Sequence, residues 1–256
     1  MVGIIGGTGF YDIGFFGEAE DISVDTEFGK VDLIRGSYKG VELIFLPRHG
    51  KEHGKLAYQV HHHANLQALK QLGVKRVFAT VAAGGISPEM NKGDLVLIDQ
   101  FISFHTRHYT YGKYSVDMTE PYCTQLRSIL QSKADELGYP IHTKGTYLSF
   151  DGPRYETRAE IQAFKLLGAD VVGMTNAPEA ALARELGLCY SAIVIVTNKA
   201  AGLSEDVPDL QTHKNTVKEN ADKVRRLISE SIVGIPESRD CQCEACLTRA
   251  LAARSH

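Results

Sequence analysis

The stretch PEAALARELGLCYSAIVIVTN, residues 178–198, contains the pattern that decides the fold. Residues 178–186 favour a helix, and the next residue is Gly187, which tolerates the left-handed backbone that commonly follows a helix. Residues 190–196 are mostly apolar and rich in β-branched side chains, as in strands that are buried on both faces of a sheet. A helix, a glycine and a buried strand in this order indicate an α/β fold.

The same alternation recurs along the 256-residue chain. The predicted strands are residues 2–5, 31–36, 41–46, 77–81, 95–98 and 190–196, and residues 38–40 join the second to the third. The predicted helices are residues 61–72, 120–137, 158–167, 178–186 and 212–232, of which the first four end at a glycine. Because no internal repeat interrupts this pattern, residues 1–232 are predicted to form one domain, followed by a linker and a cysteine-containing C-terminal tail at 233–256.

Composition excludes several classes of protein. Hydrophobic residues make up 43% and charged residues 23% of the chain, and 28 basic against 31 acidic groups give a net charge of −3. Binding to a phosphate backbone usually requires a strongly basic surface, which this balance does not predict. The longest apolar run, residues 192–196, is far shorter than the roughly 20 residues that span a bilayer. The first residues resemble the start of a strand and not a signal peptide, so we expect a cytoplasmic protein.

The five cysteines are Cys123, Cys189, Cys241, Cys243 and Cys246. Their number and spacing do not suggest a secreted disulfide scaffold. The last three could supply half of a zinc site, but no second pair of cysteines or histidines follows at ligand spacing. A disulfide or redox clip and an inert tail are the alternatives, and the sequence leaves all three open.

The segment Gly6-Gly-Thr8-Gly9 follows the first predicted strand. A dinucleotide-binding turn would require a helix directly afterwards and an acidic residue at the end of a second strand, whereas residues 10–30 have no helical period. Backbone N–H groups and the Thr8 hydroxyl could instead hold an anion, and the alternative is a plain turn.

Arg48-His49-Gly50 follows another predicted strand. The planar guanidinium of Arg48 suits a phosphate or carboxylate, and His49 adds a donor; a surface ion pair is the alternative. A metal cluster of His49, His53 and residues 61–63 is disfavoured because glycines interrupt the helix that a ligand pair would need, and no acidic ligand completes the set. We therefore predict no metal.

Four further segments lie at or just beyond predicted strand ends, where α/β proteins place ligands: residues 82–85, 152–156, 173–175 and 197–202. The first of them, Ala-Ala-Gly-Gly, would let a flat ligand approach the backbone. We predict that these four segments converge on one pocket.

In their order and spacing, seven motifs resemble one family, the trimeric purine nucleoside phosphorylases and 5′-methylthioadenosine phosphorylases. They are GGTG at 6–9, RHG at 48–50, AAGG at 82–85, DGPRYE at 151–156, GMT at 173–175, PE at 178–179 and TN at 197–198. The resemblance implies a single-domain α/β fold with a mixed, partly barrel-like sheet flanked by helices, in a homotrimer or homohexamer. It also implies a reaction of purine salvage, in which phosphate cleaves the N-glycosidic bond to give a free purine and a pentose 1-phosphate. Inorganic phosphate is the co-substrate, and no cofactor is implied.

The resemblance assigns roles residue by residue. Phosphate binding falls to Thr8, Arg48, His49, the backbone N–H of Ala82, and Thr175. Nucleoside binding falls to Tyr155, Glu156, Met174, Asn198 and His213, with the last near the ribose 5′-hydroxyl. His49, Glu156 and Asn198 are marked as catalytic residues.

Two of these positions set the expected base specificity. Asn198 can donate to the O6 atom of the purine and accept from N7–H, while Glu156 can accept from N1–H, which only a 6-oxopurine carries. Methylthioadenosine-type members have Asp and Ser at these two positions. Hydrogen-bonding sites can reject the wrong partner by roughly four to five orders of magnitude, so we expect inosine and guanosine as substrates. Methylthioinosine or methylthioadenosine is the alternative.

Other features bear on the substrate and on rival functions. His213 favours a substrate with a 5′-hydroxyl group, and the alternative is an exposed helix histidine. Val81 and Ser115 depart from the family pattern: some members have a hydroxyl side chain at the first position, and a histidine supplied by the neighbouring subunit at the second. Some heat-stable relatives carry disulfides and a Cys-x-Cys tail like residues 241–243, which suggests a disulfide-bearing protein. A non-catalytic purine-binding protein and a dinucleotide-dependent oxidoreductase are the rivals, disfavoured by the phosphate motifs and by the missing helix after Gly9.

Overall fold

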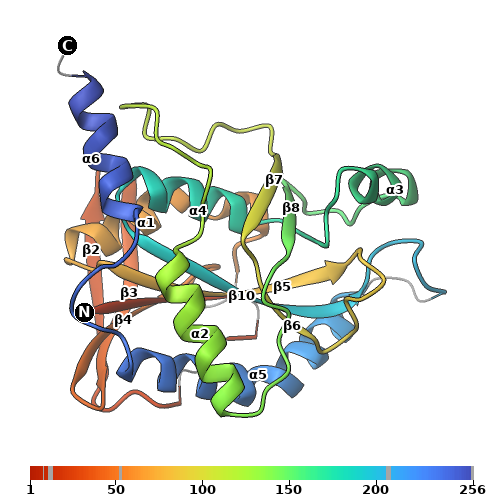
Figure 1. Ribbon diagram of the computed structural model, residues 1–256, viewed down its shortest axis with the longest axis horizontal. Helices are drawn as coiled ribbons and strands as arrows, with labels where there is room; N and C mark the ends of the chain where they lie inside the picture. The colour runs from red at the N-terminus through yellow and green to blue at the C-terminus, as the bar shows by residue number, and fades with distance from the viewer. Residues whose placement is uncertain (8, 11–13, 52–53, 206–208, 255–256) are drawn as a thin grey trace.

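The computed structural model describes all residues except 8, 11–13, 52–53, 206–208 and 255–256 (Figure 1). Its strands form one mixed sheet in the order β2-β3-β4-β1-β5-β9-β8-β7, with β10 beside β5 and β6 beside β10. The strands are β1 Val2–Gly6, β2 Glu20–Thr26, β3 Gly29–Tyr38, β4 Val41–Pro47, β5 Arg76–Gly85, β6 Leu95–Leu97, β7 Gln100–Phe104, β8 Thr146–Phe150, β9 Val171–Gly173 and β10 Cys189–Lys199. Because β5 pairs with β1, β9 and β10, the sheet branches there, which confirms the mixed, partly barrel-like α/β architecture.

Helices cover both faces of the sheet. They are α1 His62–Gln71, α2 Thr124–Glu136, α3 Arg158–Leu166, α4 Asn176–Glu185, α5 Leu210–Val233 and α6 Cys243–Arg254, with a short 3₁₀ helix at Ala57–Gln59. Contacts join α1 to α4 on one face and α2 to α5 on the other (Figure 1). All five predicted helices are confirmed, and the glycines after the first four have positive φ as expected. None of the described helices has the length and apolar character that crossing a membrane requires.

The core lies on both sides of the central strands. Along β10, Val194 and Val196 belong to one cluster of buried side chains, and Ile193 and Ile195 belong to another. Alternate side chains of a strand point to opposite faces, so this strand contributes to both clusters. The predicted strand at 190–196 is therefore buried on both faces, as its β-branched run indicated.

Two strands extend beyond their predicted ends. Residues 82–85, expected as a loop, are the last residues of β5, where Ala82 pairs with Ile195 and Gly84 pairs with Val172. Thr197 and Asn198 lie inside β10, at a shift in the pairing register between Val196 and Asn198. The side chains at both strand ends are small or polar, so the sequence pattern does not predict strand there, although the backbones are paired.

Four strands were not predicted, namely β2, β7, β8 and β9. Strand β2 has the sequence EDISVDT and lies at the sheet edge with most of its residues exposed, so its apolar pattern is weak. Strand β9 has only three residues. Short and edge strands give little periodicity to detect.

The C-terminal tail contains a helix that the sequence did not predict. Residues 243–254 form helix α6, which contacts α4. No second cysteine pair follows Cys241 and Cys243 at ligand spacing in the sequence, but the fold brings Cys123 and Cys189 beside them. That pair comes from chain positions more than 50 residues away, so linear spacing could not reveal it.

Candidate active site

A single pocket collects the predicted site residues at the C-terminal ends of β4, β5, β9 and β10. Its empty volume, including the open mouth, is about 640 Å³. The predicted residues that line it are Arg48, His49, Ala82, Tyr155, Glu156, Met174, Thr175, Asn198 and His213. Thr8, the remaining predicted site residue, lies outside the described residues. Convergence of the four predicted segments on one pocket is confirmed.

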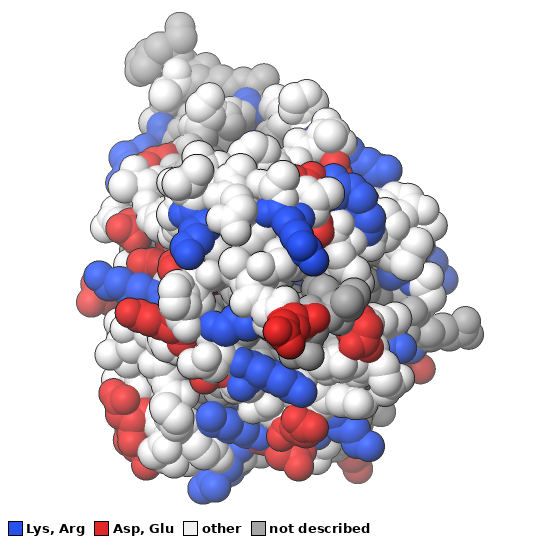
Figure 2. All heavy atoms as spheres, turned by 90° about the vertical axis from the view of Figure 1, so that its right-hand side faces the viewer, with Lys and Arg blue, Asp and Glu red and all other residues white. Residues whose placement is uncertain are grey.

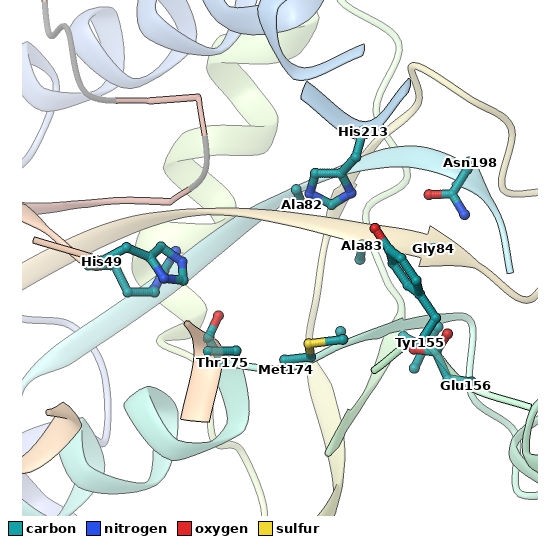
Figure 3. A pocket seen from close by; sticks show the side chains of 14 residues that line it. His49, Ala82, Ala83, Gly84, Tyr155, Glu156, Met174, Thr175, Asn198 and His213 are labelled. Carbon is teal, nitrogen blue, oxygen red and sulfur yellow. The ribbon is translucent and has the colours of Figure 1, made fainter. Parts of the chain in front are cut away.

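The lining residues separate into two ends. In Figure 3, His49 and Thr175 lie at one end, Glu156 and Asn198 lie at the other, and Met174 lies between them. This order matches a ligand with an anionic part and a flat, polar-edged part. Basic and acidic side chains are interspersed on the molecular face shown in Figure 2, so charge of one sign does not dominate it.

Arg48 is held in the wall of the pocket by a buried ion pair. Its Nε and Nη2 atoms donate to the two carboxylate oxygens of Glu179 at 2.5 and 2.9 Å, and its Nη1 atom donates to the Thr80 carbonyl at 2.8 Å. The side chains of Arg48 and Glu179 are only 1% and 0% exposed. The surface ion pair considered from the sequence is thus wrong: the pair is buried, and the bidentate contact fixes the plane of the guanidinium.

Glycine makes this arrangement sterically possible. A Cβ on Gly7 would lie 2.5 Å from the Arg48 Nη1 atom and 2.6 Å from the Thr80 carbonyl oxygen. The Gly7 N–H also donates to the Thr80 hydroxyl at 3.0 Å. The glycine-rich turn after β1 therefore packs directly against the arginine.

A helix terminus and a histidine complete this end of the pocket. Thr175 is the N-cap of α4, whose first turn presents backbone N–H groups and the positive end of the helix dipole. The His49 Nδ1 atom lies 2.9 Å from the Lys55 carbonyl oxygen. Because a carbonyl only accepts, Nδ1 carries the hydrogen, and Nε2 can donate to an anion when the ring is protonated. Arg48, His49 and the start of α4 together can hold a phosphate.

At the other end, a fixed hydrogen-bond network orients Asn198. Its Nδ2 atom donates to the Lys199 carbonyl at 2.8 Å, and its Oδ1 atom accepts from the Thr197 hydroxyl at 2.8 Å. Because the Lys199 carbonyl can only accept, the Asn198 atom that faces it must be the amide nitrogen. The register shift in β10 lies at these residues, and such bulges commonly redirect a side chain.

Thr197 connects the two polar side chains at this end. Its hydroxyl lies 3.0 Å from the His213 Nδ1 atom, and its side chain is fully buried. Burial lowers the pKa of His213 to about 4, so the ring is neutral at physiological pH. His213 is a partly buried pocket residue and not the exposed helix histidine that was the alternative.

The loop that carries Tyr155 and Glu156 is anchored at both ends. Asp151 accepts from the Thr106 N–H at 2.9 Å, and one of its oxygens lies 2.8 Å from the His105 Nδ1 atom. At the far end, Thr157 caps α3. Burial raises the pKa of Glu156 above its usual value.

A second close glycine contact places the methionine. A Cβ on Gly152 would lie 2.3 Å from the Met174 sulfur, and the φ of Gly152 is +66°. The positive φ strains any other residue here, and a side chain would displace Met174. The DGPRYE loop therefore passes directly over Met174 at the centre of the pocket.

Several residues outside the predicted set shape the site. Glu179 and Thr197 were quoted only as parts of short motifs, and Thr80 and His105 carried no signal in the sequence. Glu179 lies in a largely apolar predicted helix, residues 178–186, and a carboxylate that is buried there needs a cationic partner. This was the one sign of its role that the sequence offered. By contrast, Val81 and Ser115 do not line this pocket.

The described histidines do not gather into a ligand set. His62 is buried with its Nδ1 atom 3.7 Å from Glu179, and His63 stacks on Tyr109. His53 lies outside the described residues.

Comparison with known proteins gives a consistent result. The model of the phosphorylase superfamily matches residues 1–233. A probable 6-oxopurine nucleoside phosphorylase of Thermococcus kodakarensis is 44% identical, over 97% of this chain and 98% of the relative. An S-methyl-5′-thioadenosine phosphorylase of Pyrococcus furiosus is 43% identical, over 94% of this chain and 95% of the relative. Among solved structures, a methylthioadenosine phosphorylase from Schistosoma mansoni in complex with adenine superposes with a TM-score of 0.92 and 31% identity, covering 97% of each chain.

Proposed function

The chain belongs to the phosphorylase superfamily and is a nucleoside phosphorylase, and from this premise we propose that it cleaves inosine and guanosine by phosphorolysis, giving the free purine and ribose 1-phosphate. The observation that carries the proposal is the pairing of Glu156 and Asn198 at the end of the pocket opposite His49 and Thr175. Relatives that carry the name 6-oxopurine nucleoside phosphorylase support it.

The phosphate end supplies the nucleophile. Departure of the purine leaves an oxocarbenium ion on the ribose, and phosphate held by Arg48, His49 and the start of α4 faces this cation and then attacks it. No side chain needs to bond covalently to the sugar. The protein contributes positioning and electrostatic stabilisation, which supply most of the rate enhancement in such reactions.

The purine end of the pocket stabilises the negative charge that develops on the leaving base. The Asn198 amide nitrogen has a second hydrogen, besides the one given to Lys199, that can donate to the O6 atom as charge develops there. Its oxygen can accept from N7–H in addition to Thr197. The Glu156 carboxylate accepts from N1–H, which an adenine ring lacks.

The second candidate is phosphorolysis of 5′-methylthio nucleosides, favoured by the names of several relatives. His213 argues for an ordinary ribose. Its ring is neutral, and its Nδ1 atom is engaged by Thr197, so the Nε2 atom is available to bond a 5′-hydroxyl. A methylthio group would place apolar sulfur and carbon against this polar atom.

We further infer that the reaction needs no metal or organic cofactor, and that the enzyme is a homotrimer or homohexamer in the cytoplasm. The proposed reaction requires only the nucleoside and inorganic phosphate. Nucleic acid and membrane are not proposed as partners, because the net charge is −3 and no described helix could span a bilayer.

A substrate panel tests the proposal. Inosine, guanosine, adenosine, methylthioinosine and methylthioadenosine are incubated with the protein, with and without phosphate, and the free base is quantified. We expect release from inosine and guanosine only with phosphate, at least about 100-fold faster than from adenosine. Release without phosphate would indicate a hydrolase, and release only from methylthioadenosine would contradict the roles of Glu156 and Asn198.

The raised pKa of Glu156 predicts an acid limb in the pH profile. Only the ionised carboxylate accepts from N1–H, so kcat/KM for inosine should fall about tenfold per pH unit once the pH drops below the raised pKa of Glu156. Because burial moves this pKa upward, the fall should begin above the ordinary glutamate value of 4.5. Glu156→Gln should lower kcat/KM at neutral pH and abolish this limb.

Glu160→Gln is the matched control. The Glu160 side chain is partly exposed, and its hydrogen bond from Arg154 lowers its pKa to about 2. This variant should keep the wild-type acid limb. The assignment fails if Glu156→Gln retains the same limb.

A further inference from the structure

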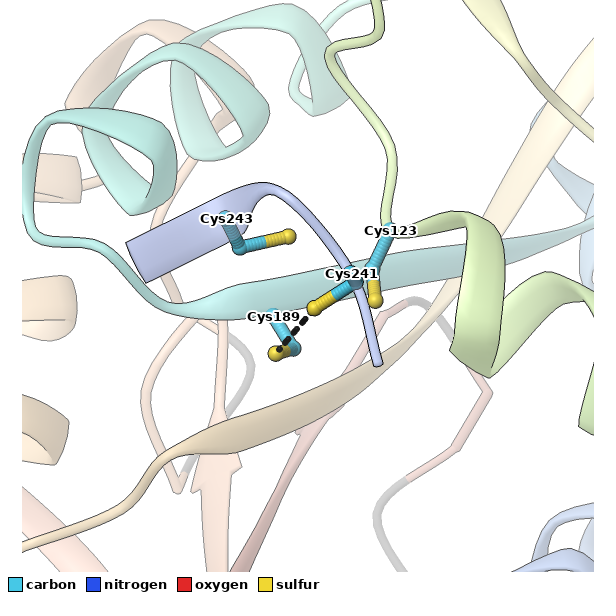
Figure 4. A group of neighbouring side chains, drawn as sticks. All are labelled: Cys123, Cys189, Cys241 and Cys243. Atoms are coloured by element: carbon cyan, nitrogen blue, oxygen red, sulfur yellow. Dashed lines mark hydrogen bonds between the residues drawn. The ribbon is translucent and has the colours of Figure 1, made fainter. Parts of the chain in front are cut away.

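Four cysteine sulfurs meet at the end of the molecule opposite the pocket. The sulfurs of Cys123, Cys189, Cys241 and Cys243 all lie within 4.8 Å of one another (Figure 4). Cys123 is the N-cap of α2, and Cys189 is the first residue of β10. Cys243 is the first residue of α6, and Cys241 lies two residues before it. Three distant segments of the chain therefore deliver thiols to one point.

The sulfur separations do not correspond to disulfides. None of the five cysteines, all of which are described, is disulfide-bonded, and the Cys189 and Cys241 sulfurs are 3.5 Å apart. A disulfide requires about 2.05 Å. Four thiolates at about 2.3 Å around a tetrahedral zinc ion would be about 3.8 Å apart, so small side-chain movements would convert the observed cluster into such a site.

Burial and backbone contacts favour a closed structural site. Cys123, Cys189 and Cys243 are buried, and Cys241 is partly buried. Hydrogen bonds fix the first two backbones, from the Cys123 N–H to the Tyr190 carbonyl at 2.8 Å and from the Cys189 N–H to the Lys75 carbonyl at 3.0 Å. Four sulfur ligands leave no position for a reacting group, which is typical of zinc sites that stabilise a fold.

The surroundings suit the charge of such a centre. Four thiolates and one Zn²⁺ carry a net charge of −2, and the four thiol protons are released to solvent on binding. Arg239 lies next to the cluster, where it forms an ion pair with Glu244 and donates to the Gly187 carbonyl at 3.1 Å. The positive end of the α2 dipole lies at Cys123.

We propose that Cys123, Cys189, Cys241 and Cys243 bind one zinc ion, which joins the C-terminal helix α6 to the phosphorylase domain. The connecting segment is held elsewhere by Arg76, whose Nη2 atom donates to the carbonyls of residues 236–238. Cys189 and Asn198 are nine residues apart on the same strand, about 30 Å. The ion therefore stabilises the fold and takes no part in the reaction.

The first test is the zinc content of the wild-type protein. We expect about one zinc per chain after purification without chelators, measured by plasma mass spectrometry. Exchange for Co²⁺ should produce the thiolate-to-cobalt charge-transfer absorption of a tetrahedral sulfur site. Alkylation of the native protein should modify fewer cysteines than alkylation after chelation in denaturant.

Two variants then assign the ligands. Cys243→Ser should lose most of the zinc and lower the Tm by about 5–10 °C, while kcat/KM for inosine at 25 °C stays within about twofold. Cys246→Ser is the matched control, because Cys246 is also buried in α6 but lies outside the cluster and accepts from Arg249 at 3.3 Å. This control should retain the zinc.

Several results would overturn the proposal. Two disulfides, seen as a mass loss of four hydrogens and one alkylatable thiol in the denatured, unreduced protein, would replace the zinc site with covalent links. Iron in place of zinc, or five titratable thiols and no bound metal after incubation with zinc chloride and dialysis, would also contradict it. Equal zinc loss in Cys243→Ser and Cys246→Ser would reject the ligand assignment.

Discussion

In the Asn198→Asp variant, the preference for inosine over adenosine is expected to fall by about three orders of magnitude, with adenosine becoming the better substrate. The wild-type amide donates to the Lys199 carbonyl and keeps its second hydrogen for O6. A carboxylate cannot donate to either oxygen and would repel both, whereas it accepts well from a 6-amino group or from N7–H. The measurement is kcat/KM for both nucleosides at saturating phosphate.

Asn220→Asp controls for the charge change itself. Asn220 lies on α5 outside the pocket, and its amide donates to the Thr216 carbonyl at 2.9 Å. This variant should keep the wild-type selectivity. An unchanged inosine-to-adenosine ratio in Asn198→Asp would remove Asn198 from the specificity site.

For Arg48→Ala we expect two losses together. Removing the guanidinium leaves Glu179 as a buried charge without its bidentate partner, which should destabilise the fold by about 3–5 kcal/mol. The variant should also raise the KM for phosphate by at least about 100-fold, because a charge-assisted contact to the anion is lost. The KM for inosine should change by less than about fivefold. Kinetics are measured well below the Tm of the variant, which is determined separately.

Arg184→Ala separates the two effects. Arg184 is 3% exposed and lies on α4, but it does not line the pocket. We expect it to lower the Tm without a selective effect on phosphate. Equal losses for phosphate and inosine in Arg48→Ala would mean that Arg48 maintains the loop and does not bind the anion.

Most helices and strands could be predicted from the sequence, because hydrophobic periodicity and helix-ending glycines are local properties of the chain. The run at 190–196 and the glycine at 187 predicted the start of β10 and the end of α4 to within one residue. Edge strand β2 is largely polar and β9 has only three residues, so neither has enough hydrophobic periodicity to be detected in the sequence. Their pairing depends on neighbours supplied by other parts of the chain.

The functional site was likewise predicted in part from the sequence and in part only from the tertiary structure. By its motifs, the sequence alone determined the fold class, the family and the segments that converge on the pocket. Only the tertiary structure decided that Glu179 neutralises Arg48, that Thr197 joins Asn198 to His213, and that four cysteines form one cluster. The physical reason is distance along the chain: Arg48 and Glu179 are 131 residues apart. Contacts of that kind arise when parallel strands bring their ends to the same edge of the sheet, and residue spacing does not record them.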